Sequence, residues 1–201
     1  MLNRQSTLKD DAPPSSRRAP PSSRRGARGT MPPPDRYPYP SHWTVARALD
    51  AYLAENGFTK EAYDAPTAEV SFLNIPMRIP NPPSRQRAVR FHDLHHVATD
   101  FGTDFRGEVE ISAWEIRRSL RGAGLYVRFI ITYLALFGFV IAPLRSFRAW
   151  TLSRAGRNSL FQDEVPYEEL LTWTVGDLRK HLSVLPGGIS ERPRQLHSKA
   201  P

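Results

Sequence analysis

Residues 84–101 read SRQRAVRFHDLHHVATDF and contain three of the six histidines of this 201-residue chain. The spacing of the apolar residues predicts that most of this stretch is one helix. At about 100° per residue, His92 stands at 0° on the helix, His96 at about 40°, Asp100 at about 80° and Asp93 at about 100°. Four side chains able to bind a metal ion would therefore share one face.

A further carboxylate follows at a suitable distance. Glu108 lies twelve residues past His96, across two glycines, so it can return on the next helix and face the first set. Histidines four apart on a helix present ring nitrogens to one point, as in zinc-binding helices of the His-Glu-x-x-His type. Asp93 is one carbon shorter than the glutamate of that motif, so it either binds the metal directly or orients a histidine.

Two histidines with carboxylates suit zinc, and they equally suit a non-haem iron centre. A divalent metal, zinc before iron, is therefore the expected cofactor. The alternative is a polar helix start whose histidines pack and form hydrogen bonds at the surface. His95, at about 300°, flanks the metal face, where it either supports the ligands or faces a substrate.

The remaining pattern predicts a mainly α fold, a single-domain helical bundle over residues 41–186. Thr44 and Gly57 are start and stop signals for a first helix at 43–56, and Thr174 with Asp177 resembles a capping box. The other expected elements are an extended segment or weak hairpin at 70–79, helices at 84–99 and 107–120, an apolar helix at 129–143, and short helices at 166–171 and 174–182.

The most apolar run is FIITYLALFGFVIAP, residues 129–143. At ~1.5 Å per residue it reaches ~22 Å, which is short of the ~30 Å hydrocarbon core of a bilayer. Two interpretations follow. The run is a central buried helix, which we slightly favour, or it lies in a bilayer interface beside Arg128, Arg145 and Arg148.

The net charge of +8 belongs to the ends of the chain. Residues 1–30 carry +5 and residues 191–201 carry +2, whereas the body carries only +1. Residues 1–40 are rich in Pro, Ser and Arg and are expected to be a disordered tail, with Met31 as a possible true start, and residues 187–201 a flexible one. We therefore expect no nucleic-acid partner. The absence of cysteine excludes disulfides and thiolate ligands.

The motif resembles that of the coenzyme Q biosynthesis protein 4 family, which is His-Asp-x-x-His, eleven residues, then Glu. His92, Asp93, His96 and Glu108 match it without a gap. HHVATDFGTDFRGEVEISAWE and the C-terminal YEELLTWTVGDLRKHLSV are also similar to the family, and the likeness covers roughly residues 85–185, as in a distant bacterial branch. His95, Asp100 and Phe101 depart from the family pattern.

The resemblance implies a set of site residues. His92, Asp93, His96 and Glu108 would be the metal ligands. Asp93, His95 and Asp100 are the candidates for a catalytic role, since each is able to handle a proton or meet a substrate. Asp100 adds an acid to the ligand side, or it is simply the residue that ends the helix.

The resemblance also implies oxidative removal of the carboxyl group at ring carbon 1 of a polyprenylated hydroxybenzoate, with hydroxylation there. The expected partners are that substrate or an isoprenoid lipid, a membrane surface, other quinone-biosynthesis proteins and a second copy of the chain. The expected location is the cytoplasmic, inner face of a bacterial membrane. Alternatives are a non-catalytic prenyl-lipid-binding scaffold with a structural metal, and a metal-dependent hydrolase.

Overall fold

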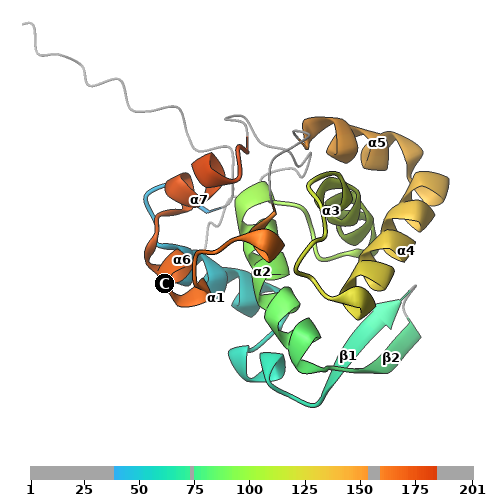
Figure 1. The fold of residues 1–201 in the computed structure, drawn as a ribbon, viewed down its shortest axis with the longest axis horizontal. Helices are drawn as coiled ribbons and strands as arrows, with labels where there is room; N and C mark the ends of the chain where they lie inside the picture. Colours follow the sequence, from blue (N-terminus) through green and yellow to red (C-terminus); the bar gives the residue numbers. More distant parts are fainter. Residues whose placement is uncertain (1–38, 73–74, 154–158, 185–201) are drawn as a thin grey trace, which may run out of the picture. The chain divides into compact units, whose positions relative to one another are not determined.

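The computed structural model describes residues 39–72, 75–153 and 159–184 (Figure 1). These residues form a mainly helical fold, as predicted. In chain order the elements are α1 (Val45–Asn56), the 3-10 helix η1 (Lys60–Tyr63), β1 (Thr67–Phe72), β2 (Ile75–Pro80), α2 (Pro83–Thr99), α3 (Phe105–Arg117), α4 (Leu125–Ile141), α5 (Pro143–Leu152), the 3-10 helix η2 (Leu160–Gln162), α6 (Tyr167–Thr172) and α7 (Val175–His181).

The capping signals of the sequence work as predicted. The Thr44 side chain accepts a hydrogen bond from the backbone N–H of Arg47 at the start of α1, and α1 ends at Gly57 in the left-handed conformation. Thr174 accepts in the same way from the N–H of Asp177 at the start of α7. Each hydroxyl satisfies a backbone donor that the helix leaves unpaired, which explains why these ends were predictable.

The chain ends expected to be loose, including Met31, lie outside the described residues except for Tyr39 and Pro40. Tyr39 is buried, and its hydroxyl donates to the Glu55 carboxylate at 3.1 Å. Tyr39, which the prediction assigned to the tail, therefore packs against the described part of the chain. The predicted hairpin is confirmed as the antiparallel pair β1 and β2.

Helix α2 lies between two groups of elements (Figure 1). It packs against α1, α7 and η1 as well as against α4 and η2. From Phe91 onward nearly all of its side chains are buried, although many are polar. The cluster of histidines therefore lies in the interior of the fold.

Helices α4 and α5 both pack against α3, and these three helices form the second group (Figure 1). Pro143 separates α4 from α5, since a proline has no N–H for an interior turn but fits the first turn of a helix. The predicted helix at 129–143 is thus shifted to 125–141, and α5 was not predicted as an element of its own.

The preferred interpretation of the apolar run, a central buried helix, is wrong. Only a narrow stripe of α4 is buried, consisting of Val127, Ile131, Ala135 and Gly138. Leu125, Phe129, Leu136 and Val140 are mostly exposed. Among the described residues, no helix is both long enough and apolar enough to cross a bilayer.

Candidate metal centre

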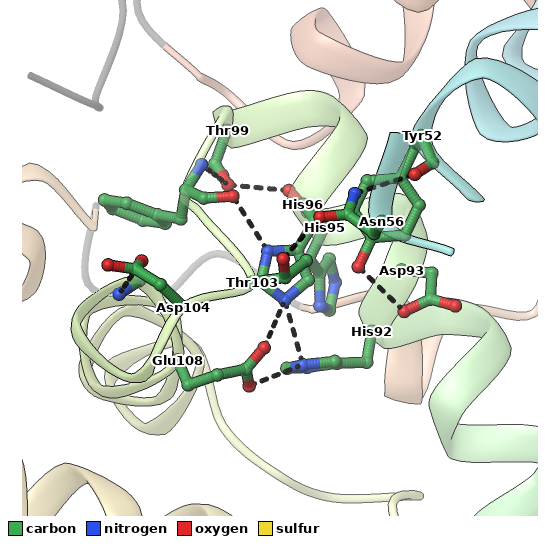
Figure 2. Close-up of polar contacts among 12 residues, drawn as sticks. Tyr52, Asn56, His92, Asp93, His95, His96, Thr99, Thr103, Asp104 and Glu108 are labelled. Carbon is green, nitrogen blue, oxygen red and sulfur yellow. Dashed lines mark hydrogen bonds and ion pairs between the residues drawn. The ribbon is translucent and has the colours of Figure 1, made fainter. Parts of the chain in front are cut away.

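His92 and His96 are one turn apart on α2 and point to the same place (Figure 2). Their Nε2 atoms lie 3.1 Å from each other, and the two rings are almost perpendicular. The predicted spacing argument is confirmed for this pair, since residues four apart on a helix lie on one face.

Glu108, in the first turn of α3, completes the set from the opposite side (Figure 2). Its carboxylate oxygens lie 3.5 Å from Nε2 of His92 and 3.4 Å from Nε2 of His96. Within the described residues, His92, His96 and Glu108 are the one group of three or more such side chains that could hold a metal ion. We call these three residues the triad.

The loop between α2 and α3 explains how Glu108 reaches this place. A β-carbon at Gly107 would lie 2.0 Å from the carbonyl oxygen of Gly102, so the backbone passes closer than any other residue allows. Asp104 caps α3 by accepting a hydrogen bond from the N–H of Gly107. The two contacts fold the loop tightly and direct the first turn of α3 towards the histidines.

The hydrogen bonds of the other ring nitrogens define what each Nε2 offers. Nδ1 of His96 donates to the carbonyl oxygen of Phe101 at 2.9 Å, and Nδ1 of His92 donates to the carboxylate of Glu115 at 2.9 Å. In the neutral rings both Nε2 atoms therefore carry lone pairs. Two lone pairs and a carboxylate converging within 3.5 Å require a cation between them, either a proton or a metal ion.

The distances within the triad fit a metal ion. Ligand atoms about 2.0–2.1 Å from a tetrahedral zinc ion lie about 3.3 Å from one another, and the triad distances are 3.1, 3.4 and 3.5 Å. Nitrogen and carboxylate oxygen donors suit zinc and iron alike, so the geometry does not select one of them.

Glu115 supports the triad and was not singled out from the sequence. Its side chain is fully buried, and one carboxylate oxygen accepts from both His92 and His95, at 2.9 and 2.7 Å. A carboxylate behind a ligating histidine fixes the ring and its tautomer. Glu115 stands seven residues after Glu108, two turns along the same face of α3, and this spacing is the signal that could have identified it.

The carboxylates of Glu108 and Glu115 are both ionised. Burial would raise the pKa of each, but the hydrogen bonds and charge of the facing histidines outweigh it and lower the pKa of Glu108 and of Glu115 to about 2. Burial also acts against a charge on His92, yet Glu115 and Glu108 raise the pKa of His92 well above its usual value. Without a metal ion, protonated His92 balances one of these two negative charges, whereas a divalent cation would balance both.

His95 does not face the triad. It is fully buried between Trp114 and Phe161, Nδ1 donates to Glu115, and Nε2 accepts from the backbone N–H of Leu160 at 3.1 Å. Burial lowers its pKa, so the ring is neutral. With both nitrogens engaged and no exposed surface, His95 supports Glu115, and the structure does not place it where a substrate could meet it.

Asp93 also lies outside the triad. One carboxylate oxygen accepts from the hydroxyl of Tyr52 at 3.3 Å (Figure 2), and the other accepts from the hydroxyl of Tyr63 at 2.5 Å. Burial raises the pKa of Asp93, and it raises those of both tyrosines. The ring of Tyr52 stacks on His96 with centroids 5.6 Å apart. Asp93 is therefore placed as an anchor beside the ligands, where the sequence had predicted a ligand or an orienting residue.

Asp100 does not extend the ligand face, because α2 ends at Thr99. Asp100 adopts the left-handed conformation with φ of 63°, and its N–H caps the helix at the carbonyl of His96. Aspartate tolerates this conformation better than most residues. The position of about 80° around the helix therefore does not apply to Asp100. The structure shows the alternative, in which Asp100 is the residue that ends the helix.

Comparison with protein-family models, curated proteins and solved structures found no match to this chain.

Proposed function

We propose that this chain is a metal-dependent enzyme of quinone synthesis. Its substrate would be a polyprenylated hydroxybenzoate, from which it removes the carboxyl group at ring carbon 1 while a hydroxyl group is added there. The convergence of His92, His96 and Glu108 supports this proposal, because these residues occupy three positions of the motif that the sequence shares with the coenzyme Q biosynthesis protein 4 family.

Three protein donors suit a catalytic metal better than a structural one. Structural zinc sites use four protein ligands, whereas catalytic sites keep a position for water or substrate. The side chains of Glu108 and His92 are 30% and 20% exposed, so the triad is reachable from solvent on their side. A divalent metal, zinc or alternatively iron, would polarise a carboxylate or phenolate oxygen of the ring.

The residues around the triad would keep it in one geometry. Glu115 and the carbonyl of Phe101 orient the two imidazoles, and Tyr52, fixed by Asp93, covers one face of His96. Loss of the carboxyl group as carbon dioxide with gain of a hydroxyl from water is a two-electron oxidation of the ring. We propose dioxygen as the oxidant, which would take up the two electrons and two protons released and leave as hydrogen peroxide. The chain would act at the inner face of a bacterial membrane, where a polyprenylated substrate resides.

A scaffold that binds prenyl lipids, with a structural metal, is the second candidate. The observation in its favour is the row of exposed apolar side chains on α4 and α5, which a catalytic centre does not require. On this alternative, the triad would maintain the fold, and removal of one ligand would not block a particular chemical step.

Deletion of the gene in its native host, followed by mass spectrometry of the quinone pool, tests the proposal. We expect a carboxylated prenyl-ring intermediate to accumulate, and an unchanged pool would contradict the enzyme. The deletion is then complemented with the wild-type chain, with Glu108→Gln and with His42→Ala, an exposed histidine outside the triad. Wild type and His42→Ala should restore the pool and Glu108→Gln should not. Restoration by a metal-free Glu108→Gln chain would favour the scaffold.

A further inference from the structure

Helix α4 reverses the usual arrangement of a surface helix. The side chains that face the protein include the small residues Ala135 and Gly138, and a β-carbon at Gly138 would lie 2.6 Å from Cβ of Val109. The large apolar side chains point the other way, and Leu125 and Phe129 are 81% and 71% exposed. Small residues towards the helical neighbours and large ones outward are typical of helices that contact lipid.

The largest exposed apolar side chains of α4 lie on one side of the helix. On α4, Leu125, Phe129, Leu136 and Val140 fall within an arc of about 60°, almost opposite the buried stripe. On α5, which follows directly after α4, Leu144 and Phe147 are also exposed. We call this surface the α4–α5 face, and it consists of Leu125, Phe129, Tyr133, Leu136, Val140, Ile141, Leu144 and Phe147. So large a set of neighbouring apolar residues marks a contact with something other than water.

The segment that carries the α4–α5 face has charged residues of one sign: residues 116–162 contain eight arginines and no aspartate, glutamate or lysine. Of these arginines, Arg118 is buried, Arg145 is paired with Glu110 of α3, and two lie outside the described residues. Arg121 and Arg128 are exposed, and Arg128 lies next to Phe129 on α4 itself. An apolar helix face with arginines beside it matches the interface of a bilayer that contains anionic lipid, since the side chains enter the acyl region and the cations meet phosphates.

The same charges argue against a second copy of this chain as the occupant. A two-fold dimer through this surface would place the same patch on both sides. The exposed Arg121 and Arg128 of one copy would then lie against the same face of the other, and residues 116–162 supply no acidic residue to pair with them. Like charges brought together at an interface are unfavourable.

We propose that the α4–α5 face docks this protein on the surface of an anionic lipid bilayer. Helix α4 lies flat on the membrane, because α3 and α5 pack against its other side and at about 25 Å it is too short to span the hydrocarbon core. This inference concerns a surface distinct from the triad, and it stands or falls independently of the reaction proposed there.

Co-sedimentation of the full chain with vesicles tests the docking surface. We expect binding to vesicles of phosphatidylcholine with phosphatidylglycerol, and much weaker binding to phosphatidylcholine alone. The double variant Phe129→Ser/Leu136→Ser should lose at least about tenfold in binding, and Arg128→Gln about fivefold on the anionic vesicles only. Met77→Ser, an exposed apolar residue on β2, is the matched control and should bind like wild type. Glu108→Gln should also bind like wild type, which separates this inference from the proposed reaction.

A label inside the bilayer gives a second measurement that does not depend on affinity. The chain has no cysteine, so L136C and M77C each accept a single nitroxide label. With vesicles, the label at residue 136 should become accessible to dissolved oxygen and protected from a water-soluble nickel complex, whereas the label at 77 should stay in water. Wild-type binding by the double variant, or a label at 136 that stays in water, would overturn the proposal. So would a dimer in sedimentation equilibrium that the double variant converts to monomer while vesicle binding is absent.

Discussion

Helices α2 and α4 are each seventeen residues long, and they place their side chains in opposite ways. Helix α2 is rich in polar residues, yet Asp93, His95 and His96 are buried. Helix α4 is the most apolar part of the chain, yet Leu125 and Val140 are among its most exposed residues. Burial thus follows the partners that the fold supplies rather than the hydropathy of each residue.

The reason for the difference is visible in the contacts of each helix. The buried Asp93 and His95 of α2 have hydrogen-bond partners from α1, α3, η1 and η2, and the buried His96 donates to the loop that follows α2. These bonds offset the cost of removing each group from water. The outward side chains of α4 are apolar, so they need no hydrogen-bond partner inside the protein. A buried polar cluster and an exposed apolar row are both departures from the ordinary pattern, and both indicate function.

The largest effect should come from removing the carboxylate on which the buried side of α2 depends. Glu115→Ala would leave Nδ1 of the buried His95 and of the partly buried His92 without an acceptor, and breaking a buried pair of this kind costs about 3–5 kcal/mol. Urea unfolding measures it. Glu164→Ala, at an exposed glutamate, should change the free energy of unfolding by less than about 0.5 kcal/mol. A cost for Glu115→Ala below about 1 kcal/mol would show that the cluster does not hold α2.

The next largest effect concerns the metal itself. Titration with cobalt(II), followed by its visible absorption, should show one site per chain in the wild type. Glu108→Ala should weaken this binding by at least about 100-fold, since a ligand matters no less than the outer partners that are worth 10–100-fold. Binding should also weaken as the pH falls, because an imidazole must lose its proton before it coordinates. His42→Ala should bind like wild type, and equal binding by Glu108→Ala would remove the triad as a metal site.

The part of this comparison that the sequence could predict is the part that depends on local rules. His92 and His96 are related by helix geometry alone, and Glu108 follows across a loop too short to carry it far. Thr44 and Thr174 cap their helices by bonds to residues three positions on. Such features need no knowledge of the neighbouring elements.

The rest depends on contacts between distant elements. Asp93 has a wheel angle suitable for a ligand, but the hydroxyls that hold it come from α1 and η1. The role of Glu115 depends on how α3 is rotated about its axis against α2. Asp100 is a local case, because the helix predicted at 84–99 already stops before it. The exposed side of α4 could not be predicted either, because a helix that is apolar on all sides does not indicate which side packs against the protein.

A smaller effect should come from a single methyl group on the buried side of α4. Gly138→Ala would place a carbon 2.6 Å from Cβ of Val109 and 2.8 Å from Oγ of Ser146, so α4 would have to move away from α3 and α5. Overpacking of this kind costs about 1–3 kcal/mol, and thermal unfolding measures it. An unchanged melting temperature would mean that α4 is not held closely against its neighbours.

The smallest effect should come from the largest apolar change. Leu136→Ser removes an isobutyl group from the most apolar helix, and in a core this would cost several kcal/mol. Because Leu136 is 64% exposed on the α4–α5 face, we expect the free energy of unfolding in the absence of lipid to change by less than about 0.5 kcal/mol. The two positions are two residues apart, and the smaller change in side-chain size, Gly138→Ala, should thus cause the larger loss of stability. A loss above about 2 kcal/mol for Leu136→Ser would show that this side chain packs inside the protein in solution, and the contrast between α2 and α4 would then fail.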